Sequence, residues 1–248
     1  MKTQKLYYEN MYLARCEAVV TEVRNDGIVT DKTVAFAEGG GQIGDIGIIV
    51  KDGVGVPFFD TIKGVGKPLV IQDFPTIQID TPVIHKVNPD DIGGFLVGDR
   101  VVIEIDISHR IKTTVHHSAL HLALMAATKY RPDIVRYIKG CNIAVDSARL
   151  DFASQMRFTD EDMENINSEI KTMIEQGTPI ETFKHNGIDD AWDWKCGDFV
   201  IPCGGTHVGS TSKIGEVIVK RKTKGKGIER MIVAVTNELL GVDDYVRD

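Results

Sequence analysis

Two short segments, far apart in the chain, each place two metal-binding side chains four residues apart. His117 and His121 lie in the apolar run VHHSALHLALMAATKY, and Cys203 and His207 lie in PCGGTHV. On a helix, residues i and i+4 share a face, so the two histidines can bind one ion together. The two glycines of the second segment let the backbone fold back until thiolate and imidazole face one point. Three imidazoles and one thiolate suit zinc, and such a site requires a fold that brings the two segments together.

The residues beside these four side chains limit which kinds of metal site the sequence permits. His116 points about 100° away from the face that His117 and His121 share. Metalloproteases with HExxH need Glu directly after the first histidine, and this chain has Ser118 there. Each pair alone is also compatible with histidines buried in a core, but the coincidence of two pairs favours a metal. The metal can be catalytic or structural, since a closed tetrahedral site uses all four ligands.

The hydrophobic periodicity changes near residue 100. Before it, short stretches alternate apolar and polar residues and are separated by Gly and Asp, which is typical of the strands of a small barrel or sandwich. After it, helical and strand-like segments are mixed. We therefore expect an α+β protein, with an N-terminal small β-barrel domain over residues 1–100 and an α+β zinc-binding domain over residues 101–248. The boundary falls within 96–108.

Helix signals are clear in the second part. The run Val115–Tyr130 predicts a buried helix that ends before Pro132, because proline disfavours helix in the residue before it. Thr159 is a good cap for a helix over Asp160–Gln176, whose apolar stripe stops at Gly177. That stripe consists of Met163, Ile166, Ile170 and Ile174. KIGEVIVKRKTKGKGIERMIVAVTNELL predicts a hairpin followed by a short closing helix.

Composition disfavours several classes of protein. The chain has 248 residues, a formal net charge of −7 and no apolar run long enough to cross a bilayer, so we expect neither a membrane protein nor a non-specific nucleic-acid binder. The first residues lack the apolar stretch of a signal peptide. Four cysteines without a CxxC spacing favour a reducing, cytoplasmic setting.

Two other segments carry candidate binding residues. The loop GGGQ (39–42) lets the backbone approach a ligand closely but lacks the Lys-Ser/Thr of a P-loop, and a sharp turn in a β-domain is the plainer interpretation. The other segment, KRKTKGK, suits contact with a nucleic-acid backbone or a solvated hairpin tip. Its cationic residues are Lys220, Arg221, Lys222, Lys224 and Lys226.

HHSALHL and CGGTHV together resemble the editing domain of alanyl-tRNA synthetase and its free-standing relatives, the AlaX proteins. The resemblance continues in order along nearly the whole chain, through FAEGGGQ, GDIG, ARLDF and GIERMIVAVT. Within this family, the chain resembles the stand-alone form that carries an N-terminal barrel. It implies a zinc-dependent hydrolase that acts in trans on tRNA(Ala) wrongly charged with serine and, in many members, glycine.

The resemblance also implies roles for further residues. It puts Gln42, with Gly40 and Gly41, near the substrate. Ser118 fits the family at its position, and its hydroxyl is a candidate partner for a seryl hydroxyl, although a small polar residue tolerated on a helix explains it equally. We expect the basic segment to contact the tRNA. The backbone N–H groups of two turn residues are candidates for stabilising an oxyanion, namely Gly204 and Gly205.

Several alternatives stay open at this point. Zinc either activates water and polarises the ester carbonyl or holds the amino group while a free water attacks, and no general base is identified. The chain could edit another tRNA, such as seryl-tRNA(Thr), although CGGTH favours the alanyl type, or be a non-catalytic tRNA-binding module with structural zinc. The family often has a polar residue where this chain has Ile138, so the choice between serine and glycine is open. Monomer and homodimer are both compatible.

Overall fold

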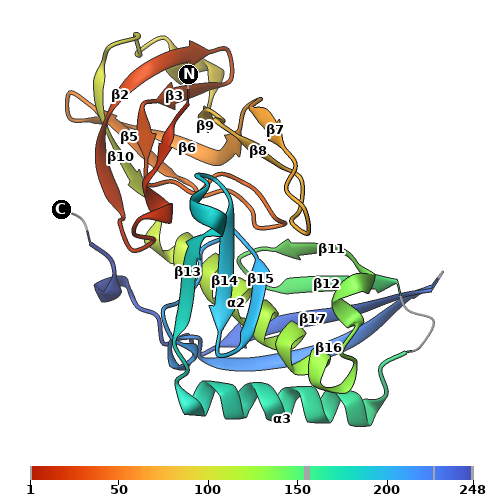
Figure 1. Cartoon of the computed structure of the whole chain (residues 1–248). Coiled ribbons are helices and arrows are strands. Elements are labelled where there is room, and N and C mark those ends of the chain that lie inside the picture. The colour runs from red at the N-terminus through yellow and green to blue at the C-terminus, as the bar shows by residue number, and fades with distance from the viewer. Residues whose placement is uncertain (1, 154–156, 226, 247–248) are drawn as a thin grey trace.

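The computed structural model describes residues 2–153, 157–225 and 227–246. Its N-terminal part is a closed six-stranded barrel with strand order β10-β2-β3-β9-β6-β5, at the top of Figure 1. These strands are β2 (Arg15–Arg24), β3 (Gly27–Thr30), β5 (Gly47–Lys51), β6 (Val54–Lys63), β9 (Val83–Val87) and β10 (Arg100–Ile105). The expected α+β composition and barrel are thus present. β10, a strand of the barrel, begins at residue 100 and extends to residue 105, and the division into two domains there stays a prediction.

The barrel is built by the alternation that the sequence showed. Ile28, Ile49, Phe58 and Ile103 point inward from four different strands and are fully buried. Short elements surround it: β1 (Gln4–Lys5) pairs in parallel with β4 (Lys32–Thr33), and β7 (Lys67–Leu69) pairs with β8 (Ile77–Ile79) as a hairpin. A single helical turn, α1 (Pro89–Ile92), precedes β10.

The long helix α2 (Ile107–Tyr130) leads away from the barrel. Its end before Pro132 is as predicted, but it begins at Ile107 rather than Val115. The side chain of Asp106 caps the start by accepting a hydrogen bond from the N–H of His109 at 3.0 Å. The polar residues of the first turns hid this start, because they lack the apolar run that marked the rest of the helix.

A buried ion pair joins α2 to the barrel. Arg110 and Asp45 are both fully buried and contact each other through two guanidinium nitrogens. Arg110 also donates to the carbonyl oxygens of Met11 and Val34, at 2.8 and 2.7 Å. Removing one partner would strand a buried charge at a cost of about 3–5 kcal/mol. The pair therefore fixes the helix, and whatever it carries, relative to the barrel.

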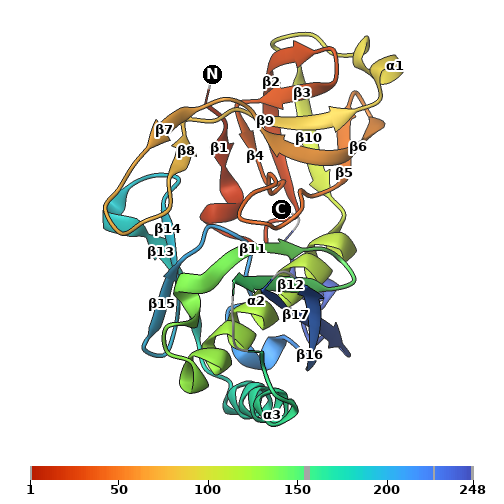
Figure 2. The ribbon, with the colours of Figure 1, turned by 90° about the vertical axis from the view of Figure 1, so that its right-hand side faces the viewer.

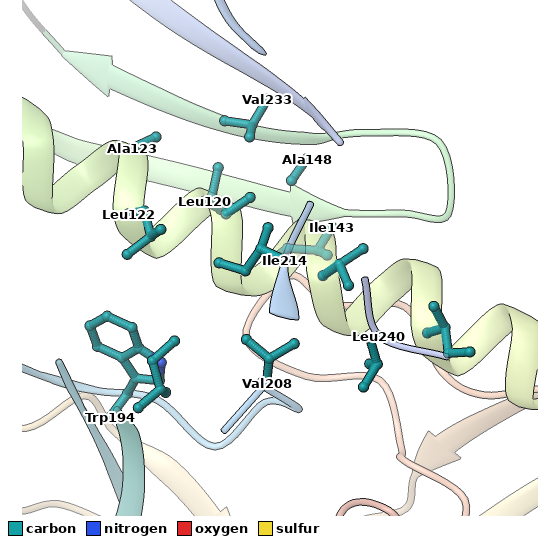
Figure 3. Close-up of a cluster of buried hydrophobic side chains, with 14 of the residues drawn as sticks. Leu120, Leu122, Ala123, Ile143, Ala148, Trp194, Val208, Ile214, Val233 and Leu240 are labelled. Carbon is teal, nitrogen blue, oxygen red and sulfur yellow. The ribbon is translucent and has the colours of Figure 1, made fainter. Parts of the chain in front are cut away.

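A four-stranded sheet covers α2 on one side. Its strand order is β11-β12-β17-β16, made of β11 (Ile138–Ile143), β12 (Ala148–Ala153), β17 (Ile228–Thr236) and β16 (Glu216–Gly225). Figures 1 and 2 show α2 between this sheet and the strands β13–β15. In Figure 3, Ala148 and Val233 of the sheet lie on one side of α2, and Trp194 and Val208 lie on the other. The helix is apolar on several faces because it is covered on several sides.

The helix α3 (Asp160–Gln176) packs against α2 and β16 as a second layer. Its bounds, its Thr159 cap and its stop at Gly177, which adopts a left-handed φ of 62°, are as predicted. Its buried residues are Met163, Ile166, Ile170 and Met173, whereas Ile174 is only partly buried.

The remaining sheet carries the second predicted ligand segment. It consists of β13 (Ile180–Lys184), β14 (Trp192–Cys196) and β15 (Phe199–Pro202), in that order. The predicted hairpin is β16–β17, but the predicted closing helix is wrong. Asn237 adopts a left-handed φ of 52° directly after β17, and the chain then forms only a 3-10 turn at Val242–Asp244.

Candidate metal centre

The four predicted ligands come together although they lie on α2 and on the loop after β15. One potential ligand atom from each of His117, His121, Cys203 and His207 lies within 4.8 Å of the others. Cys203 Sγ is 3.5 Å from His117 Nε2 and 3.3 Å from His207 Nε2. Zinc–ligand bonds of 2.0–2.3 Å in a tetrahedron place ligand atoms roughly 3.3–3.8 Å apart. The two distances from Cys203 Sγ therefore match a zinc site, and the remaining ligand atoms lie within 4.8 Å of one another.

Gln42 fixes the tautomer of His117. Its Oε1 accepts the backbone N–H of Thr206 at 3.0 Å, which identifies this atom as the oxygen, and its Nε2 donates to Thr206 Oγ1 at 2.9 Å. The contact of 2.8 Å between Oε1 and His117 Nδ1 must then be donated by the imidazole. The Nε2 of His117 keeps its lone pair and faces Cys203. A metal-binding histidine needs this arrangement.

Ser118 fixes the tautomer of His207 in the same way. Its hydroxyl donates to the carbonyl of Thr114 at 2.9 Å and accepts the N–H of Val208 at 3.1 Å. Since its one proton is used, it accepts from His207 Nδ1 at 3.3 Å. These contacts leave Ser118, which is fully buried, no hydrogen-bonding capacity for a substrate. Ser118 and Gln42 thus lie behind the ligands rather than at the surface of the cavity described below.

Thr206 was not singled out from the sequence, yet it holds this support together. Besides its two bonds to Gln42, its hydroxyl contacts Thr114 Oγ1 at 2.8 Å. The barrel loop, α2 and the Cys203 turn therefore meet in one buried network. The only sequence signal for Thr206 was its place beside a predicted ligand.

The chemistry of the four side chains fits a metal. Burial lowers the pKa of His117 to about 3 and the pKa values of His121 and His207 well below 6.5, so all three imidazoles are neutral at pH 7 and each has a lone pair. Burial raises the pKa of the Cys203 thiol to about 12, although the N–H of Gly205 lowers it. His121 Nδ1 is buried with no hydrogen-bond partner among the described residues. A cation bound here would be a partner for the imidazole lone pairs and would favour the thiolate form of Cys203.

The glycines of the turn have separate roles. A Cβ on Gly205 would lie 2.2 Å from His117 Cε1 and 2.4 Å from its Nδ1, so only glycine allows the turn to pack on that ring. A Cβ on Gly204 would meet only the Tyr8 side chain among its nearest atoms, with Tyr8 Oη closest at 3.1 Å. Since the Gly205 N–H is directed at the Cys203 sulfur, Gly204 is the freer donor for an oxyanion. The oxyanion role of both stays a prediction.

The glycine-rich loop reaches the same region from the barrel. Gly39 and Gln42 exchange two backbone hydrogen bonds of 3.1 and 3.0 Å, which closes the loop. Gly40 and Gly41 have φ of 59° and 86°, and a Cβ on Gly41 would lie 2.6 Å from Cys141 Sγ. Gly40 lines the cavity at the metal centre, and Gly41 packs against Cys141 on β11.

The metal centre opens into a cavity of about 560 Å³. Three of the four ligands line it, whereas His207 lines a smaller cavity of about 170 Å³ on the other side of the turn. Most of its wall is apolar and comes from the barrel, the β7–β8 hairpin, α2 and β14. Its carboxylates among the described residues are Glu38, which is exposed, and Asp190, which pairs with Lys5. A general base is therefore not evident.

The described cations of the predicted basic segment do not all lie on one face of the sheet, and their contact with tRNA stays a prediction. Lys220 and Lys222 are exposed on β16, whereas the side chain of Arg221 points to the opposite face and lies 3.8 Å from Asp160 and 3.9 Å from Glu229. Lys224 is also exposed. Lys226 lies outside the described residues. In the part of the chain that the structure describes, no helix has the length and apolar character to span a membrane.

Comparison with known proteins supports the resemblance that the motifs indicate. Residues 195–232, which include Cys203 and His207, match the family described as the threonyl and alanyl tRNA synthetase second additional domain. The chain is 28% identical to an alanine–tRNA ligase of Metallosphaera sedula, over 92% of this chain and 26% of that protein. It is 29% identical to that of Pyrococcus furiosus, over 94% and 26%, and 27% identical to that of Saccharolobus islandicus, over 99% and 28%. The chain thus spans about a quarter of the length of these curated relatives.

Proposed function

We propose that this chain, which is similar to one segment of alanine–tRNA ligases, is a zinc-dependent hydrolase that edits mischarged tRNA(Ala) in trans. It would cleave the ester that joins serine, or glycine, to the 3′-terminal ribose, with water supplying the OH of the released amino acid and the ribose oxygen regaining its proton. One observation carries the proposal: a cluster of three imidazoles and a thiolate opens into a cavity of about 560 Å³. We expect such a protein to act in the cytoplasm, where tRNA is used.

In this proposal the chain's own residues hold the ligands rather than react. Gln42 and Ser118 accept the Nδ1 protons of His117 and His207, so that both Nε2 lone pairs point to one place. Gly205 lets the Cys203 turn close on the His117 ring. Zinc, when bound, supplies Lewis acidity toward the ester and its attacking water. The apolar wall of the cavity excludes bulk water from the rest of the substrate.

The amino acid is selected at the inner end of the cavity. Leu120, Leu124, Ile138 and Leu150 line it together with the metal ligands. Because Ser118 is not accessible, a seryl hydroxyl must find its partner elsewhere, and Ile138 offers none. These apolar walls would select a side chain by its small size and would offer it no hydrogen bond, which suits glycine as well as serine.

The open face of the β11-β12-β17-β16 sheet is our candidate for tRNA contact. In the register of the sheet, Lys220 pairs with Ile232 and then Arg149, and Lys222 pairs with Arg230. Directly paired residues share a face, so Lys220, Lys222 and Arg149 form a basic row on the side away from α3, which is interrupted by Ile232 and by the Arg230–Asp151 ion pair. A row of cations at strand spacing suits a phosphate backbone.

Structural zinc is the competing function. A site with four protein ligands is typical of closed, structural zinc, and catalysis requires that one ligand position be open or expandable. A protein that uses zinc in this way would bind tRNA without hydrolysing it. Editing of another mischarged tRNA, such as seryl-tRNA(Thr), would use the same centre with a different tRNA surface.

Deacylation assays distinguish these functions. Purified protein is mixed with Ser-tRNA(Ala), Gly-tRNA(Ala), Ala-tRNA(Ala) and Ser-tRNA(Thr), with and without a chelator. We expect hydrolysis of the first two, loss of activity on chelation and recovery with zinc. His121→Ala should abolish hydrolysis and leave tRNA affinity largely unchanged. Zinc-loaded, folded protein that binds tRNA(Ala) but turns over none of these substrates would favour the structural function, and preference for Ser-tRNA(Thr) would identify the other tRNA.

A further inference from the structure

Lys63, at the end of β6, lines the cavity of the metal centre and has no assigned role. Among the described residues, its ammonium group makes no hydrogen bond or ion pair. Burial lowers its pKa, and the nearby Lys5 lowers it further. A partly buried cation without a counter-ion among the described residues is unusual, because even partial desolvation of the charge is costly. An anion from outside the chain would relieve that cost.

The other charged groups of the cavity do not neutralise Lys63. Lys5 and Asp190 form a buried ion pair, and the second oxygen of Asp190 accepts the N–H of Asp80 at 3.1 Å. Asp190 therefore attracts Lys63 only at longer range. Glu38 also lines the cavity but is exposed to solvent. Among the described residues, one partly buried positive charge is therefore left unpaired on this wall.

Lys63 lies beside the glycine-rich loop whose Gln42 supports His117. A Cβ on Gly39 would be 2.8 Å from the Lys63 Nζ. Gly39 is joined by two backbone hydrogen bonds to Gln42, whose side chain holds His117. The ammonium group and the metal centre are thus separated by one tight loop.

Aromatic side chains complete the cavity beyond Lys63. Trp192 stacks on Tyr8, with ring centroids 4.9 Å apart and planes at 17°, and both line the cavity. Phe74 lines it from the loop between β7 and β8 and contacts His185 at 4.4 Å between centroids, next to β14. Figure 2 shows this hairpin beside the β13–β14 connection. Flat apolar walls of this kind bind nucleobases by stacking.

We infer that this half of the cavity is a binding site for the 3′-terminal nucleotide of the tRNA, with Lys63 bound to that nucleotide's 5′-phosphate. The inference rests on the proposed function and adds to it a specific contact. The ester lies at the metal centre, the phosphate lies against Lys63, and the base lies against the aromatic wall. A lysine ammonium binds phosphate as a point charge, and the partial burial of Lys63 strengthens the contact.

Binding of two matched ligands tests this site. The probes are 3′-seryl-amido-3′-deoxyadenosine with and without a 5′-phosphate, which carry an amide in place of the ester and are not hydrolysed. Titration calorimetry on zinc-loaded protein should show that the phosphate strengthens binding about 10-fold or more in the wild type. In Lys63→Met this preference should disappear, while affinity for the probe without phosphate stays the same. Lys63→Arg should keep most of the preference.

Controls separate this contact from a structural role. Lys171→Met, an exposed change on α3, should leave both affinities unchanged, and thermal unfolding should show that Lys63→Met is folded. Should Lys63→Met fail to fold, Lys63→Gln takes its place. Equal affinity of the wild type for both probes, or an equal loss for both in the variant, would overturn the inference. Deacylation of Ser-tRNA(Ala), measured in parallel, shows whether the proposed function itself has failed.

Discussion

Gln42 Oε1, in the barrel, accepts a hydrogen bond of 2.8 Å from Nδ1 of His117 on α2. The same oxygen accepts the N–H of Thr206 at 3.0 Å. One buried amide thus connects the three parts of the chain that build the metal centre. Its role is to hold one imidazole in one tautomer and one orientation, so its loss should appear first in metal affinity.

Gln42→Met should weaken zinc binding by about 10- to 100-fold, the usual cost of losing a partner of a metal-binding histidine. Methionine has a similar length but leaves His117 Nδ1–H and the Thr206 N–H without acceptors. Competition with a chromogenic chelator measures the change directly. Gln176→Met, at the exposed end of α3, is the matched control and should bind zinc as the wild type does. Unchanged zinc affinity in Gln42→Met would show that the imidazole does not depend on this contact.

The sequence predicted the ligands and not their supports, for a physical reason. His117 and His121 share a helical face, and the turn with its two glycines restricts where the side chains of Cys203 and His207 can point. Local geometry within each segment therefore positions two of the four side chains. Gln42 and Ser118 were instead placed at the substrate. Their partners are 75 and 89 residues away, and only the folded chain shows that these partners use up the polar groups.

The secondary structure was predictable where the apolar residues follow a single periodicity. α3 has one apolar stripe, a Thr159 cap and a terminal glycine, and its bounds agree with the expectation. The first turns of α2 and the end of the chain were not predictable in this way. Ser108 to Thr114 contains Ile111 as its one apolar residue, and Arg110 is buried there through its pair with Asp45 rather than through an apolar stripe. The closing helix fails because Asn237 leaves the strand with a left-handed φ.

Gly205→Ala tests the close approach of the turn to His117. The added Cβ would overlap Cε1 of the imidazole at 2.2 Å, and both groups are held by other bonds. We expect a loss of stability of about 1–3 kcal/mol from overpacking and a fall in zinc affinity of at least roughly 10-fold. Gly140→Ala, where a Cβ meets nothing within 4 Å, is the matched control. Chemical denaturation and chelator competition report the two effects, and equal behaviour of the variants would contradict the packing argument.

The basic row on the open sheet face predicts a change in salt dependence. Lys220→Ala with Lys222→Ala should reduce the slope of log affinity against log salt by about 1.4 to 1.8, the value for two lost phosphate contacts. Arg221→Ala provides the contrast, because its side chain points to the other face, toward Asp160 and Glu229. Anisotropy of labelled tRNA(Ala), titrated at several salt concentrations, measures the slopes. A larger change of the slope in Arg221→Ala than in the double lysine variant would contradict the proposal, because it would place the tRNA on the face of the sheet that carries α3.

His85 makes the barrel sensitive to acid. It is fully buried, its Nδ1 donates to the carbonyl of Ile28 at 3.1 Å, and Thr33 Oγ1 donates to its Nε2 at 2.8 Å. Burial lowers its pKa from 6.5 to about 4, so the unfolded chain binds this proton more readily than the folded one. The neutral histidine therefore contributes stability above pH 6.5 that is lost as the pH falls toward 4. At pH 5 the loss is about 2 kcal/mol.

His85→Gln removes this titration while keeping a polar side chain beside Ile28 and Thr33. Glutamine does not titrate, so the variant should lose about 2 kcal/mol less than the wild type between pH 7.5 and pH 5. The comparison uses urea unfolding of zinc-loaded protein at both pH values, so that the zinc-site histidines contribute equally to the two proteins and cancel in the double difference. The variant is expected to be somewhat less stable at pH 7.5, because it fills the space less well, and this offset does not affect the pH dependence. An identical acid loss in both proteins would mean that another buried group causes it.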